Sequence, residues 1–79
     1  MKVRILFFGA TADIVGTSEL QFDLSSSESA STVFERILSK YPSLTNHHLR
    51  YSVNQTYATG EETICEGDEL ALFTAVSGG

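Results

Sequence analysis

A single segment of this chain has apolar residues at helical spacing, and this limits how its strands can be covered. Four apolar side chains recur at positions i, i+3, i+4 and i+7, as on one face of an amphipathic helix: Phe34, Ile37, Leu38 and Tyr41. Thr32 and Glu35 have the spacing of a capping box at a helix start, and Pro42 ends the pattern. We therefore expect one main helix, packed on one face of a sheet.

Two segments near the N-terminus alternate as strands do. Residues 2–8 alternate between two faces, one carrying Val3, Ile5 and Phe7 and the other Arg4, Leu6 and Phe8. Residues 19–24 direct every second side chain inward: Leu20, Phe22 and Leu24. Between them, residues 10–15 predict a short helical turn closed by Gly16 in a left-handed conformation. The short connection favours antiparallel pairing of the two strands.

The second half of the chain predicts further strands and a final one beside the first. Residues 51–53 and 56–58 flank a turn at Asn54-Gln55, and residues 70–73 follow a turn signal. A final strand next to the first would put Glu69, Ala71 and Phe73 on the same outer face as Arg4, Leu6 and Phe8. The predicted fold class is α+β, a mixed sheet with one main helix, and its outer face carries an exposed apolar patch near Leu6, Phe8 and Phe73.

Composition excludes several classes of function. The 79 residues suffice for one small domain, and ten acidic against five basic residues give a net charge of −5, which disfavours nucleic acid and anionic membrane as partners. No apolar run is long enough for a membrane-spanning helix, and no secretory signal is recognisable, so we expect a cytoplasmic protein.

Few residues are candidates for a metal, nucleotide or thiol site. The single Cys65 has no cationic neighbour in sequence and is predicted to be a small packed residue. His47 and His48 are predicted to face solvent, and we expect no metal site. The chain has no phosphate-binding glycine loop, so it is not expected to bind ATP itself.

The C-terminus narrows to residues with small side chains. After a domain of residues 1–73, residues 74–79 could extend roughly 20 Å as a flexible tail, long enough to carry a terminal carboxylate through a narrow channel in another protein. Gly78 and Gly79 have no Cβ to meet the channel walls. A frayed terminus is the plain alternative.

Taken together, three stretches resemble the small subunit of molybdopterin synthase. They are residues 2–8, residues 53–55 and residues 67–73 leading to Val76-Ser77-Gly78-Gly79. The resemblance covers nearly the whole chain and implies a ubiquitin-like β-grasp fold. It also implies a sulfur carrier, non-catalytic alone, whose Gly79 is adenylated, becomes a thiocarboxylate and donates sulfur to a cyclic pterin precursor.

The same resemblance implies partners. A separate large subunit would receive the tail, in a heterotetramer of two small and two large subunits, and an adenylating and sulfurating enzyme would use ATP on behalf of this chain. The interface would include Leu6, Phe8 and Phe73 together with Val76 and Ser77.

Two positions depart from the family pattern. Thr74-Ala75 stand where the family commonly has two prolines, so the tail is expected to be less stiff. Ala12-Asp13 stand where an Arg-Glu pair is common. Both positions bear on partner contacts, and neither touches the chemistry at Gly79.

Other functions fit the same features. The chain could be a ubiquitin-like sulfur carrier for thiamin thiazole synthesis or tRNA thiolation. It could also be a protein modifier that is joined to target lysines through Gly79, or an interaction domain whose glycines are accidental.

Overall fold

A computed structural model describes residues 1–74 of the chain. Its elements follow in the order β1 (Lys2–Phe7), α1 (Ala10–Val15), β2 (Glu19–Asp23), β3 (Glu28–Ser29), α2 (Ala30–Lys40), η1 (a 3-10 helix, Pro42–Asn46), β4 (Leu49–Val53), β5 (Thr56–Tyr57), β6 (Thr63–Ile64) and β7 (Glu69–Thr74). None of these helices has the length and hydropathy needed to cross a membrane.

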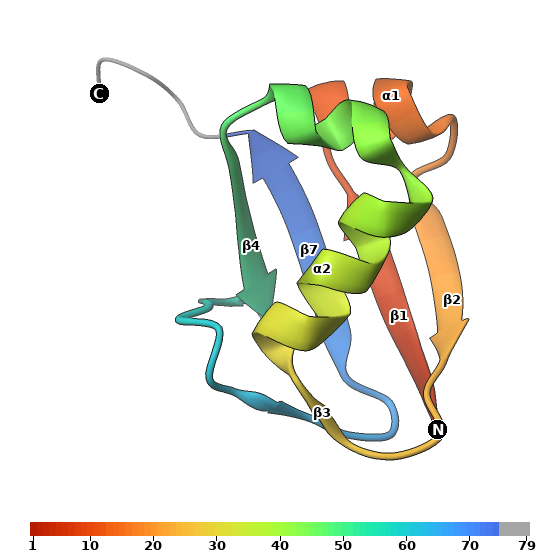
Figure 1. Ribbon diagram of the computed structural model, residues 1–79, viewed down its shortest axis with the longest axis vertical. Coiled ribbons are helices and arrows are strands. Elements are labelled where there is room, and N and C mark those ends of the chain that lie inside the picture. Colours follow the sequence, from red (N-terminus) through yellow and green to blue (C-terminus); the bar gives the residue numbers. More distant parts are fainter. Residues whose placement is uncertain (75–79) are drawn as a thin grey trace.

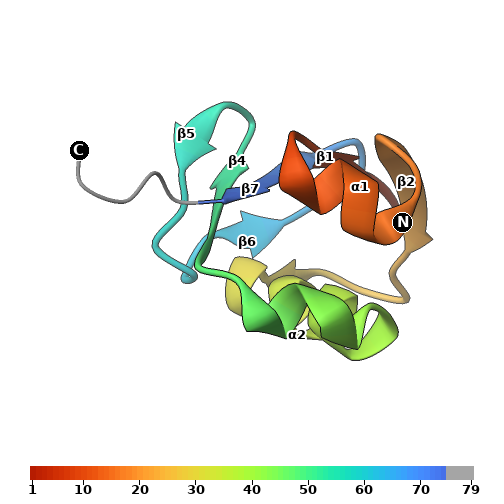
Figure 2. The same ribbon diagram turned by 90° about the horizontal axis from the view of Figure 1, so that it is seen from above.

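The main sheet has five strands, and the first and last strands of the described chain, β1 and β7, are neighbours inside it. Its order is β2-β1-β7-β4-β5, and β1 and β7 pair in parallel while the other neighbours are antiparallel. The two short strands β3 and β6 pair separately. Figures 1 and 2 show α2 lying across one side of the sheet. This is a β-grasp arrangement, and it confirms the predicted α+β fold and the pairing of the first and last strands.

Alternation in the strands builds the core between the sheet and α2. The inward residues of β1 and β7 are fully or almost fully buried, as are three residues of α2; together they are Val3, Ile5, Phe7, Leu70, Leu72, Ala30, Val33 and Ile37. Of the four predicted helix contacts, Ile37 is fully buried, while Phe34, Leu38 and Tyr41 pack partly buried against this cluster. The helix therefore turns a slightly different face to the core than the apolar spacing predicted.

The start of α2 differs from the capping-box prediction. The helix begins at Ala30, and the hydroxyl of Ser29 caps it by accepting a hydrogen bond from the backbone N–H of Thr32 at 3.3 Å. Ser29, three residues before Thr32, supplies the same kind of acceptor as a threonine, so the helix starts within the serine-rich segment. Pro42 ends α2 as expected and opens η1.

A two-residue turn joins β4 to β5. Asn54 and Gln55 both have positive φ, 49° and 71°, as in the two-residue turns that match the twist of a hairpin. This tight turn sets β5 opposite the end of β4.

Cys65 was predicted to be packed, but it is exposed, because Ile64 is the residue of β6 that points into the core.

Candidate functional site

Side chains of β1, β7 and β4 meet on the outer face, defined here as the sheet surface turned away from α2. Leu6 of β1 lies opposite Ala71 of β7, and on the other side of β7 Ser52 of β4 lies opposite the same Ala71. Phe73 comes two residues after Ala71 and therefore points to the same face. The pairing agrees with the prediction that Leu6 and Phe73 share this face. Phe8 was expected in the same strand as Leu6 but lies one residue past the end of β1, where its backbone N–H donates to the carbonyl oxygen of Leu72 at 3.1 Å.

An aromatic patch, made of Phe8, Tyr57 and Phe73, occupies one end of the outer face. Phe8 is 53% exposed and Tyr57 is 68% exposed, and they are the large apolar side chains most open to solvent in residues 1–74. The rings of Tyr57 and Phe73 are 5.8 Å apart and inclined by 58°. Aromatic rings at this separation attract one another, which helps to keep the patch in one arrangement.

A shallow hollow lies beside this patch. It has a volume of about 280 Å³ and is lined by Ser52, Gln55, Tyr57 and Phe73. Its two aromatic walls are bordered by a hydroxyl and an amide, which can donate or accept hydrogen bonds. The hollow is therefore suited to one apolar side chain of a partner, with polar groups at its rim.

Charged side chains that form ion pairs lie at the other end of the outer face. Arg4 lies between two carboxylates, 3.3 Å from Glu19 and 3.4 Å from Glu69. The hydrogen bond with Glu19 raises the pKa of Arg4, so the guanidinium stays charged. These groups satisfy one another, and the aromatic patch is left as the part of the face that gains most from being covered.

The patch lies beside the C-terminal end of β7. Phe73 is followed by Thr74, the last residue of β7, which is paired with Leu49 at the start of β4. The predicted tail residues Val76 and Ser77, and the predicted reactive glycines Gly78 and Gly79, lie outside the described residues. A partner that covers the patch would thus contact the domain right beside the start of the tail.

Sequence reasoning missed Tyr57, the most exposed member of the patch. The signal was available, because a two-residue turn at Asn54-Gln55 pairs Tyr57 with Ser52. Ser52 in turn shares a face with Ala71, which places Tyr57 on the outer face. His47 and His48 are exposed as predicted, and within the described chain no group of three or more His, Cys, Asp or Glu side chains is arranged to hold a metal ion.

The fold and the exposed aromatic sheet face define a small ubiquitin-like protein. Residues 5–79 match the ThiS family, and the chain belongs to that family. It is similar to the molybdopterin synthase sulfur carrier subunit of Haemophilus influenzae, at 30% identity over 98% of this chain and 99% of the relative. It is also similar to the protein of the same name from Chlamydomonas reinhardtii, at 25% identity over 100% of both chains.

A solved structure gives the same architecture. SAMP1 from Haloferax volcanii superposes with a TM-score of 0.84 at 24% identity, covering 100% of both chains. At this level of identity the likeness shows the fold alone. It agrees with the strand order and the single main helix described above.

Proposed function

We propose that this chain is the sulfur carrier subunit of a molybdopterin synthase. The observation that carries the proposal is the family match, which extends from β1 through the C-terminal Gly78-Gly79. Relatives that align along essentially the whole chain bear this name. The aromatic patch beside the start of the tail supports the proposal, because a carrier must be held by its partners at the point from which its terminus extends.

The proposed chemistry takes place at Gly79. A carboxylate is a poor acyl donor, so an activating enzyme first joins the Gly79 carboxylate to the AMP part of ATP and releases pyrophosphate. A donor of sulfur at the oxidation level of sulfide then displaces AMP: the C–S bond forms as the C–O bond to AMP breaks, and the terminus becomes a thiocarboxylate. The thiocarboxylate sulfur is a nucleophile that must be shielded from water and positioned, which a channel in the partner supplies. Because this activation uses ATP, we place the cycle in the cytoplasm.

The proposed partner is the large subunit of the synthase. It covers the aromatic patch and takes the tail into its active site, where the sulfur passes to a cyclic pterin precursor. The assembly contains two small and two large subunits. Gly78 and Gly79 suit this role because a side chain at either position would widen the part of the chain that enters the channel.

Loading of the terminus tests the first half of this proposal. The purified chain is incubated with the activating enzyme, ATP and a sulfur donor, and its intact mass is measured. We expect the gain in mass that replacing one oxygen by sulfur produces, and no gain for a chain lacking Gly78 and Gly79. Accumulation of heavier adducts joined to lysines of other proteins would instead identify a protein modifier.

A further inference from the structure

Arg50 differs from the other arginines of the described chain in having no acidic partner there. It is exposed on β4, directly opposite Phe73 in the strand register. Arg4 pairs with Glu19 and Glu69, and Arg36 pairs with Glu28 at 2.8 Å. Within residues 1–74, Arg50 makes no ion pair and no side-chain hydrogen bond.

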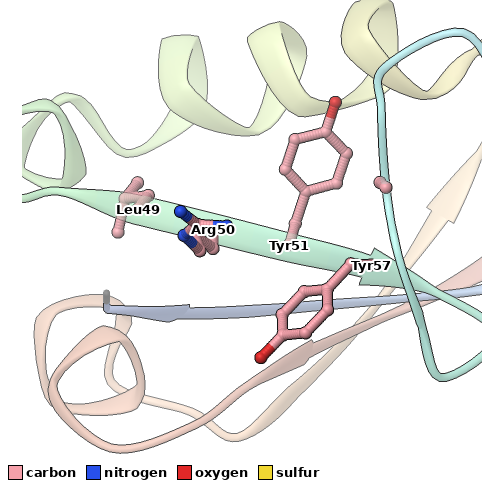
Figure 3. Close-up of a pocket in the computed structure, with 5 residues that line it drawn as sticks. Leu49, Arg50, Tyr51 and Tyr57 are labelled. Carbon is pink, nitrogen blue, oxygen red and sulfur yellow. The ribbon is translucent and has the colours of Figure 1, made fainter. Parts of the chain in front are cut away.

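A second hollow connects Arg50 with the aromatic patch. It has a volume of about 150 Å³ and is lined by Leu49, Arg50, Tyr51, Tyr57 and Ala58. Tyr57 also lines the larger hollow next to Phe73, so the two depressions share this side chain. Figure 3 shows Arg50 on β4 between Leu49 and Tyr51, with Tyr57 on the opposite side of the strand from Tyr51.

Tyr51, the neighbour of Arg50 in sequence, is held by packing and carries no negative charge that could pair with Arg50. Tyr51 points toward α2, where its ring stacks on Phe34 with centroids 4.3 Å apart. Burial raises the pKa of Tyr51, and the carboxylates of Glu62 and Glu35 add to the effect. Tyr51 therefore stays neutral at physiological pH, and the charge of Arg50 is not offset from this side.

A partner that covers the aromatic patch also takes water away from Arg50. A guanidinium that loses its hydration without gaining an anion destabilises an interface, whereas one that meets a carboxylate forms two parallel hydrogen bonds. The chain itself carries a net charge of −5, so a partner surface complementary to the whole domain would be basic. The net charge of the domain thus favours a basic partner surface overall, whereas Arg50 requires an acidic side chain at the point of the partner that faces it.

We propose that Arg50 selects the partner by binding a carboxylate of the synthase large subunit, next to an apolar side chain that enters the hollow lined by Ser52, Gln55, Tyr57 and Phe73. The inference rests on the proposed function. It deepens that function by giving the partner's contact segment a stated chemistry, one apolar residue and one acidic residue a short distance apart. A large subunit that presents lysine or arginine at this point is rejected by like charge.

The test compares two substitutions that remove the same charge. Arg50→Gln and Lys2→Gln each leave a net charge of −6, and both residues are exposed, but Lys2 begins β1 at the end of the sheet away from the patch. Affinity for the large subunit from the same organism is measured by calorimetry at two salt concentrations. Arg50→Glu and a Phe8→Asp variant complete the set.

We expect Arg50→Gln to weaken binding about tenfold and Arg50→Glu about a hundredfold, because the second change also repels the partner carboxylate. Lys2→Gln should stay within about twofold of the unaltered chain, in line with a charge outside the interface. Salt should weaken binding of the unaltered chain more than that of Arg50→Gln, since only the former has the charge pair to screen.

Two results would overturn the inference, and the second would overturn the proposed function as well. If Phe8→Asp abolishes binding while Arg50→Gln matches Lys2→Gln, the patch is an interface but Arg50 does not select the partner. If the unaltered chain does not bind the large subunit, the inference fails together with the proposed function.

Discussion

The hydroxyl of Thr11 donates a hydrogen bond to the carbonyl oxygen of Leu72 at 3.1 Å, although the two residues are 61 positions apart in sequence. Thr11 is fully buried at the start of α1, and its hydroxyl also lies 2.7 Å from the carbonyl oxygen of Phe8. Leu72 accepts a further bond from the N–H of Phe8 at 3.1 Å. These contacts hold α1 against the ends of β1 and β7. The ribbon of Figure 1 shows α1 following the end of β1.

Thr11→Val removes this hydroxyl while nearly preserving the shape of the side chain. We expect the free energy of unfolding to fall by about 1–2 kcal/mol, because a buried hydrogen bond is lost and two carbonyl oxygens keep only their backbone donors. Urea denaturation measures the change. Thr11→Ser, which keeps the hydroxyl, serves as the matched control for the hydrogen bond. Equal stability of Thr11→Val and the unaltered chain would show that the hydroxyl contributes nothing.

Glu62 predicts a specific pH dependence of stability. Its carboxylate accepts hydrogen bonds from the backbone N–H of Thr59 at 2.7 Å and of Gly60 at 2.9 Å. These bonds, with that from Thr59 the strongest, lower the pKa of Glu62 below its ordinary value of 4.5. The folded state therefore holds this proton less tightly than the unfolded state does. The resulting stabilisation is complete above the ordinary pKa and is lost as the pH falls through the lowered pKa.

Glu62→Gln should remove that contribution. We expect the variant to be less stable than the unaltered chain at pH 7, with a difference that shrinks as the pH falls below 4.5, the ordinary pKa of the carboxyl. Thermal unfolding at a series of pH values measures it, with Glu61→Gln as the control, since Glu61 is exposed and makes no side-chain hydrogen bond in the described chain. A stability difference independent of pH would contradict the assignment.

Phe8→Asp tests whether the aromatic patch is a partner surface. The side chain is 53% exposed, so the substitution should leave the free energy of unfolding nearly unchanged. Binding to the large subunit should weaken by about 30-fold or more, as expected when an aromatic anchor of an interface is lost and a charge is introduced.

The control for this variant keeps the same added charge on the same face. Gln21 is exposed on β2, opposite Arg4 and away from the patch, so Gln21→Asp should bind normally. If both variants bind with the affinity of the unaltered chain, the partner contacts a different surface.

Much of the fold could be predicted because local patterns and tertiary structure agree. The alternation in residues 2–8 and the apolar final strand place β1 and β7 side by side, and Gly16 takes the left-handed conformation, with φ of 89°, that was expected from its place after α1. By contrast, the start of α2 was misplaced because Ser29 and Thr32 are both good caps. The choice of Ser29 depends on two contacts that are distant in sequence: the pairing of β3 with β6, and the hydrogen bond from the N–H of Ala30 to the carbonyl oxygen of Glu62.

The candidate site was predicted in part for a similar reason. The face of Phe73 follows from strand parity within β7, and the position of Phe8 was predicted by extending the alternation of β1 one residue past its end at Phe7. The pairing of Tyr57 with Ser52 follows from the local turn, but the face that Tyr57 and Arg50 occupy depends on the register between β4 and β7, which are far apart in sequence. The exposure of Cys65 depends likewise on which residue of the two-residue strand β6 faces the core.

The most direct measurement of the central claim is the transfer of sulfur from Gly79. The thiocarboxylated chain is mixed with the synthase large subunit and the cyclic pterin precursor, and the intact mass of the chain is followed together with the formation of molybdopterin. We expect the terminal sulfur to disappear as molybdopterin forms, with no transfer from Gly79→Val, whose side chain does not fit a narrow channel. Retention of the sulfur by the thiocarboxylated chain, with a large subunit that is active toward its own small subunit, would contradict the proposed function.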